Sequence, residues 1–103
     1  PKWMTYLLNK DETVARDFAR FGLNVMGIQD QGDDMANAKA GIVALQSFIK
    51  DELHLPTSLS EVGINDEKFD ELKVKACYGQ DALSRAYRSL SQEDCLNIYK
   101  MCL

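Results

Sequence analysis

The stretch of sequence that decides the fold is Leu55-Pro56-Thr57-Ser58-Leu59-Ser60-Glu61-Val62-Gly63-Ile64. Pro56 blocks the continuation of a helix, because it lacks an N–H and disfavours helical backbone in the residue before it. Ser58 and Glu61 have the spacing of a capping box, and Gly63 is free to take the left-handed conformation that closes a helical turn. The stretch therefore predicts a tight corner between two helices.

Apolar side chains recur at helical spacing on both sides of this corner, and no segment has the pattern of a strand. Helices are expected over residues 1–9, 11–26, 33–53, 65–78 and 91–102. Asp11, Asn65 and Ser91 are the expected N-caps of three of them, and Asp33 or Asp34 caps the third helix. Residues 80–90 lack a clear period and fit either a short helix or an ordered loop.

The third of these helices carries the widest apolar stripe, which predicts burial against several neighbours. Leu45 and Phe48 lie within that stripe and are expected at the centre of the core. Other aromatic side chains at helical spacing are also expected in the core: Trp3, Tyr6, Phe18, Phe21, Phe69 and Tyr99. A chain of 103 residues with 46% hydrophobic residues fits one small domain, residues 1–103. The predicted fold class is all-α, a small helical bundle.

Composition excludes several classes of function. A net charge of −4 disfavours nucleic-acid binding, which needs a concentrated basic surface. No apolar run approaches the ~20 residues that cross a bilayer, and residues 1–8 do not form a secretory signal. Cys77, Cys95 and Cys102 form neither an even disulfide set nor a C-x-x-C motif, so we expect reduced thiols in a cytoplasmic protein.

The residues that could carry chemistry have structural interpretations that fit better. His54 is the only histidine and fits a helix C-terminus better than a metal site. The acidic residues at 30, 33 and 34 lack the pattern of a calcium loop and fit helix capping. Glycines at 22, 27, 32 and 41 follow no strand, so they fit helix packing and helix stops instead of a phosphate loop. Cys77 has no histidine predicted nearby and fits a core position better than a nucleophile. We therefore expect no catalytic, cofactor-binding or metal-ligating residue in this chain.

Tyr87 and Arg88 lie in the segment without clear periodicity. There an aromatic ring and a bidentate donor could face a cleft, or belong to a plain surface loop. These two side chains are the candidates for a substrate-cleft loop.

Several segments of the chain match a known pattern in a fixed order: Pro1-Lys2-Trp3-Met4-Thr5-Tyr6, Ala15-Arg16-Asp17-Phe18-Ala19-Arg20-Phe21-Gly22 with Val25-Met26-Gly27-Ile28, Ala40-Gly41-Ile42 through Phe48-Ile49, the corner from Leu55, and Leu90-Ser91 with Glu93-Asp94 before Ile98-Tyr99. Together they resemble the C-terminal helical domain of the iron-containing (group III) alcohol dehydrogenases, nearest the butanol dehydrogenase branch. His54 stands where that family often has glycine.

The resemblance implies the C-terminal part of a dehydroquinate synthase-like alcohol dehydrogenase, which interconverts primary alcohols and aldehydes by hydride transfer. The full-length enzyme would use iron or zinc together with NAD or NADP, and would act as a homodimer on a small alcohol or aldehyde. The family's nucleotide-binding domain and metal-ligating histidines have no counterpart here, so this chain is expected to be an inactive fragment without a cofactor of its own. The alternative is a free-standing, non-catalytic helical interaction module.

Overall fold

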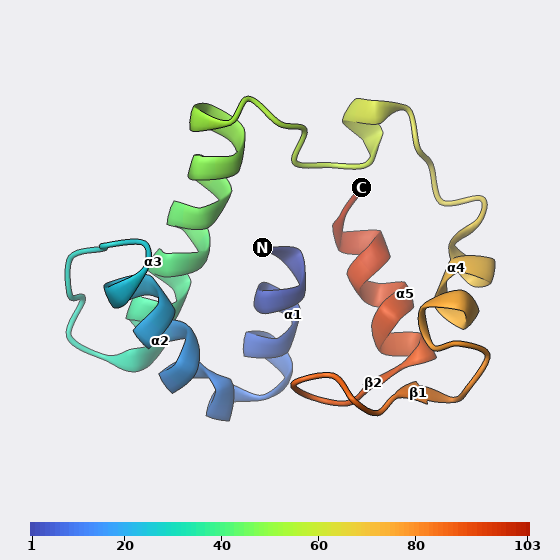
Figure 1. Cartoon of the computed structure of the whole chain (residues 1–103), viewed down its shortest axis with the longest axis horizontal. Coiled ribbons are helices and arrows are strands. Elements are labelled where there is room, and N and C mark those ends of the chain that lie inside the picture. The colour runs from blue at the N-terminus through green and yellow to red at the C-terminus, as the bar shows by residue number, and fades with distance from the viewer. The chain divides into compact units, whose positions relative to one another are not determined.

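The computed structural model describes all of residues 1–103 and divides them into two compact units, residues 1–57 and 58–103. Five α-helices make up most of the regular structure (Figure 1). The predicted all-α class is confirmed. The expectation that no strand forms is wrong in one place, where residues 82–83 pair with residues 90–91 in an antiparallel arrangement.

The first unit contains these elements: α1 (Lys2–Lys10), η1, a 3₁₀ turn (Glu12–Val14), α2 (Ala15–Asn24), α3 (Asp34–Ser47) and η2, a π-helical turn (Phe48–Glu52). Asp11 and Asp33 are N-caps as predicted, since each side chain accepts a hydrogen bond from a backbone N–H two or three residues later. The single helix expected over residues 11–26 is instead a 3₁₀ turn followed by α2, and it ends at Asn24.

Helices α2 and α3 lie side by side through two glycines (Figure 1). A Cβ atom added to Gly41 would lie 2.6 Å from the Cα of Gly22, a distance that real Cβ atoms essentially never show. The predicted role of these glycines in close helix packing is confirmed. The core of the unit forms around this contact and consists of Leu7, Leu8, Val14, Ala15, Phe18, Ala19, Ala38 and Ile42.

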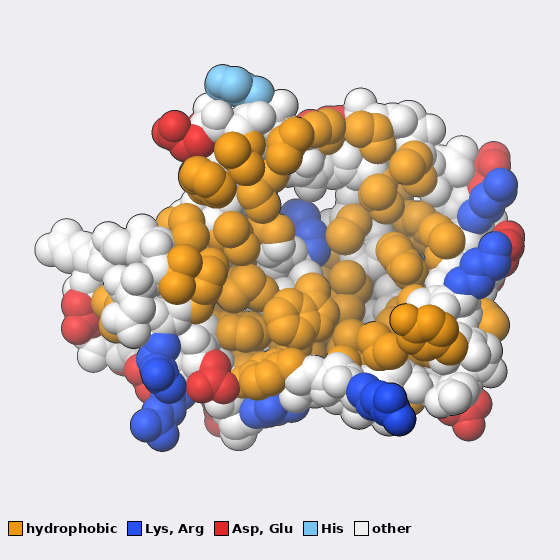
Figure 2. All heavy atoms as spheres, viewed as in Figure 1, with side chains coloured by type: hydrophobic (Ala, Val, Ile, Leu, Met, Phe, Trp, Pro, Cys, Tyr) orange, Lys and Arg blue, Asp and Glu red, His pale blue; other side chains and the backbone are white.

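The expectation that Leu45 and Phe48 occupy the centre of the core is wrong. Leu45 is only half-buried, and the side chain of Phe48 is 44% exposed. The physical reason is that a periodic stripe shows which residues share a face of the helix and not what packs on that face, and this part of the stripe is only partly covered. Beyond Phe48 the helix also widens, because the Phe48 carbonyl accepts a hydrogen bond from Leu53 N–H five residues later. Figure 2 shows hydrophobic side chains open to solvent around His54, the one histidine.

The corner forms as predicted. His54 takes a left-handed backbone with φ of 53°, and residues 54–57, which include Pro56, belong to no helix or strand. Ser58 Oγ accepts a hydrogen bond from Glu61 N–H at 3.3 Å, and Gly63 is left-handed with φ of 75°. The capped element is a single 3₁₀ turn, η3 (Ser60–Val62), because Gly63 closes it at once.

The second unit continues with α4 (Phe69–Ala76), β1 (Ala82–Leu83), β2 (Leu90–Ser91) and α5 (Gln92–Met101). Asn65 does not cap α4, contrary to expectation. Its side chain accepts from Glu67 N–H at 3.1 Å in a local turn, which competes with helix formation and delays α4 to Phe69. The predicted cap at Ser91 is confirmed as a full capping box with Asp94.

Helices α4 and α5 pack against each other in this unit. The rings of Phe69 and Tyr99 lie 5.6 Å apart between centroids. At the other end of α5, the carbonyl of Cys102 accepts a hydrogen bond from Leu59 N–H at 2.6 Å, which ties the η3 turn to the last helix. The core of the unit consists of Phe69, Cys77, Leu90, Cys95 and Leu96.

Candidate functional site

The segment between α4 and α5 is an ordered loop, the second of the two interpretations that the sequence left open. It begins where Tyr78 and Gly79 take left-handed backbone with φ of 54° and 73°, which turns the chain away from α4. Ala82 then pairs with Ser91, and Leu83 with Leu90, in antiparallel register. The side chain of Gln92 donates to the carbonyl of Gln80 at 2.8 Å, which holds the start of the loop against α5.

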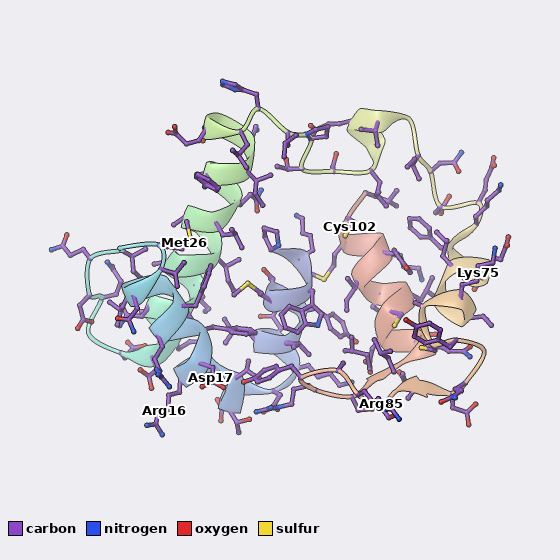
Figure 3. All side chains as sticks on the ribbon, in the orientation of Figure 1. Arg16, Asp17, Met26, Lys75, Arg85 and Cys102 are labelled. Atoms are coloured by element: carbon purple, nitrogen blue, oxygen red, sulfur yellow. The ribbon has the colours of Figure 1, made fainter.

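A hollow of about 680 Å³ lies on this loop. Its lining residues are Cys77, Tyr78, Gln80, Ala82, Leu83, Ser84, Arg85 and Ala86. The polar groups in this set are a guanidinium, an amide, a phenol, an aliphatic hydroxyl and a thiol, and Figure 3 labels Arg85 among them. The lining contains no carboxylate and no imidazole, and its polar groups can form hydrogen bonds with a ligand.

Tyr87 and Arg88 follow directly after the residues that line the hollow. The guanidinium carbon of Arg88 lies 4.4 Å from the centroid of the Tyr87 ring, and Arg88 Nη1 donates to the Tyr87 carbonyl at 3.1 Å. The tyrosine is 44% exposed and the arginine is half-buried. The two side chains therefore form one stacked unit on the outside of the loop, and a change in either would alter both.

Two of the three cysteines meet beneath the loop, which the sequence did not indicate. The sulfurs of Cys77 and Cys95 lie 3.8 Å apart, and the two residues are only 1% and 7% exposed. Burial, together with the contact to Cys77, raises the pKa of the Cys95 thiol to about 11. The predicted core position of Cys77 is confirmed. The contact joins residues eighteen apart in the sequence on different helices, a pairing that no local pattern encodes.

The acidic residues near α3 form structural hydrogen bonds and helix caps. Asp33 caps α3, and Asp34 lies in its first turn. Asp30 does not cap a helix, contrary to expectation. Its carboxylate accepts from the buried Asn37 side chain at 2.9 Å and from Gly32 N–H at 2.9 Å, and these bonds hold its pKa below the usual value. The same Asn37 accepts from Gln31 N–H at 2.7 Å, so Asp30 and Asn37 together brace the loop before α3.

All of residues 1–103 match the Fe-containing alcohol dehydrogenase family, C-terminal, and the chain belongs to that family. The chain is 32% identical over 100 residues to the NADH-dependent butanol dehydrogenase A of Clostridium acetobutylicum and 31% identical to the NADH-dependent butanol dehydrogenase B of the same organism. These alignments cover 97% of this chain but 25% of each relative, so the chain spans about a quarter of their length. No solved structure matches it.

The side chains present do not fit the metal or the nucleotide that the family implies. Nowhere in the chain do three His, Cys, Asp or Glu side chains gather as a metal site requires. The only strands are two residues long and antiparallel, and neither leads through a glycine-rich loop into a helix that could receive a pyrophosphate. The structure also contains no helix with the length and apolar character of a membrane span.

Proposed function

We propose that these 103 residues are the C-terminal helical domain of a metal-dependent, NAD(P)-linked alcohol dehydrogenase that interconverts primary alcohols and aldehydes. The observation that carries this proposal is the family match over the whole chain, together with about one-third identity to two butanol dehydrogenases. In the whole enzyme the metal, iron or zinc, and the nicotinamide would be held by residues outside this chain, because no group here fits either of them.

The surface of the first unit supports a role as part of a larger protein. Large apolar side chains are exposed along α3 and the turn after it, with Val43 at 65%, Phe48 at 44% and Leu55 at 52%. Large apolar side chains exposed in this number fit an interface with another part of a protein. We infer that this face packs against the nucleotide-binding portion of the same polypeptide. A homodimer of the whole enzyme and a cytoplasmic location belong to the same proposal.

The experiment that tests the activity uses the purified protein in its natural length. With iron or zinc supplied, it should oxidise NADH or NADPH in the presence of butyraldehyde and reduce NAD or NADP with 1-butanol. A protein that binds none of these nucleotides and gives no turnover with short or long alcohols under any metal condition would contradict the proposal. That result would favour the alternative of a non-catalytic helical interaction module.

Within this enzyme, we propose that residues 79–89 lie beside the substrate cleft and help to set its shape. The support is that residues of this loop line a hollow. The loop is also ordered, because β1 pairs with β2 inside it between α4 and α5. Loops of this kind vary without disturbing the core and therefore commonly carry specificity. Tyr87 and Arg88 would act as shape-setting residues and not as catalysts.

Tyr87→Ala and Arg88→Ala should each change KM or the preference for alcohol chain length while metal content stays the same. Because the two side chains stack, the double variant should lose little more than either single variant. Ser89→Ala, an exposed neighbour, is the matched control and should behave as the parent protein. If both single variants keep parental kinetics across short and long alcohols, the loop is a plain surface connection.

A further inference from the structure

Two thiols from different helices face each other in the second unit without being joined. Cys77 ends α4, Cys95 lies in the first turns of α5, and their sulfurs are 3.8 Å apart. A disulfide bond is about 2.05 Å long, so small side-chain rotations would have to close the remaining gap. We propose that Cys77 and Cys95 are a redox modification site, which a hydroperoxide converts to a reversible disulfide.

Cys77 is the cysteine that an oxidant would meet first. It belongs to the lining of the 680 Å³ hollow, whereas Cys95 does not. Burial raises the pKa of the Cys95 thiol to about 11, which favours its protonated form, and the thiolate is the nucleophilic form. The roles are therefore unequal: the sulfur of Cys77 attacks the oxidant, and the sulfur of Cys95 then resolves the product.

The chemistry balances with one hydroperoxide per disulfide. The sulfur of Cys77 attacks the terminal oxygen of the hydroperoxide, and the O–O bond breaks. The other oxygen takes up the proton of the Cys77 thiol and leaves as an alcohol, or as water when the oxidant is hydrogen peroxide. Cys77 is then a sulfenic acid. The sulfur of Cys95 attacks the Cys77 sulfur, an S–S bond forms, and the hydroxyl leaves as water with the proton of Cys95. Two sulfurs have given up one electron each, and the peroxide has taken both.

The reverse step needs a small thiol reductant, which attacks the disulfide and restores both thiols. In the oxidised form the bond would join α4 directly to α5 and enclose the loop between them, including β1 and β2. Since Cys77 is 1% exposed, the reaction should be slower than that of a free thiol. Cys102 lies seven residues beyond Cys95 on α5 and is the natural internal control, because it is half-buried and unpaired with another thiol.

The test is to treat the reduced, folded protein with hydrogen peroxide, denature it, alkylate the remaining thiols and map the peptides without reduction. The expected product has lost two hydrogens, contains a Cys77–Cys95 crosslink and carries the alkyl label on Cys102. When a dithiol reductant is added before alkylation, all three cysteines should again carry the alkyl label. Cys77→Ser and Cys95→Ser should abolish the crosslink, while Cys102→Ser should keep it.

The proposal is overturned if both Cys77 and Cys95 remain alkylatable after denaturation at peroxide levels that oxidise Cys102. It is equally overturned if Cys77 proceeds to a sulfinic acid with no crosslink, or if the crosslink involves Cys102. Should either serine variant fold poorly, the parent protein alone decides, because the crosslinked peptide identifies both sulfurs. The rate at which the Cys77–Cys95 crosslink forms should not rise when mild denaturant is added. A rate that increases with the unfolded fraction would also overturn the proposal, because the reaction would then belong to the unfolded chain.

Discussion

At the scale of single residues, His54 adopts a conformation that its side chain disfavours. Its φ of 53° lies in the left-handed region, where the Cβ of any L-residue crowds the following carbonyl. This residue lies between the end of η2 at Glu52 and Pro56, where the chain leaves the helix. The strain at this residue is therefore imposed by the corner and not by the histidine.

Replacing His54 by glycine should stabilise the protein. The gain should be roughly 0.5–1 kcal/mol, since glycine removes the left-handed strain but adds freedom to the unfolded chain. Urea unfolding followed by circular dichroism measures it. His54→Ala is the matched control and should give no such gain, because alanine keeps a Cβ. Equal stability of the glycine and alanine variants would show that the corner stores no strain at this position.

Cys95 gives a second expectation at this scale, a dependence of stability on alkaline pH. Its pKa is raised from 9.0 to about 11, so the folded state favours the neutral thiol more than the unfolded state does. The resulting stabilisation is fully present below pH 9 and is lost as pH rises through 11. Cys95→Ala should flatten the fall in unfolding free energy between these values, measured with a reductant present. Cys102→Ala should leave the fall unchanged, and an identical slope in both variants would contradict the assignment.

At the scale of elements, the contact between α2 and α3 depends on the absence of side chains at Gly22 and Gly41. A Cβ on Gly22 would meet the carbonyl oxygen of Asn37 at 2.9 Å, and a Cβ on Gly41 would meet the Cα of Gly22 at 2.6 Å. These obstacles are backbone atoms, which cannot rotate away. Two helices would have to separate to admit one methyl group.

Gly41→Ala should therefore destabilise the protein, even though alanine favours a helix more than glycine does. Overpacking of this kind costs about 1–3 kcal/mol, which exceeds the gain of about 1 kcal/mol in helix propensity. Thermal or urea unfolding gives the value. Lys39→Ala, an exposed change on the same helix, is the control and should stay within about 0.5 kcal/mol of the parent. A gain in stability from Gly41→Ala would show that the helices lie further apart.

At the scale of the whole molecule, the chain has two compact units and no centre of catalytic groups. Each unit has its own buried core, and each also leaves large apolar side chains exposed, such as Phe48 in the first and Val62 in the second. The relatives are about four times as long, with the chain covering 25% of them. These facts support the proposal made above that the chain is one domain of a larger enzyme.

The 103-residue chain by itself should bind neither a catalytic metal nor a nicotinamide nucleotide. The reason is the lack of any cluster of three ligating side chains and of any strand, glycine-rich loop and helix in succession. Metal analysis after dialysis with iron or zinc, and calorimetry with NADH, are the measurements. Stoichiometric metal, or nucleotide binding at micromolar affinity, would contradict this. The natural-length protein measured in parallel is the positive control.

Local patterns predicted much of the fold because they depend on neighbours in sequence. The stop at Pro56, the left-handed Gly63 and the capping box at Ser91 all formed as predicted. Leu45 and Phe48 did not behave as predicted, because periodicity shows which residues could share a face but not what covers that face. The delayed start of α4 was missed since the Asn65 side chain bonds its own backbone equally well in a turn.

The sequence by itself determined the helical class, the corner and the family, because these rest on residue order and on short-range backbone preferences. Only the tertiary structure decided that Cys77 meets Cys95, that Asp30 braces Asn37, and that residues 79–89 form a paired loop with a hollow. Each of those contacts joins residues whose separation in sequence carries no local signal. They arise from the way whole helices pack, and packing depends on the shape of every side chain in the core.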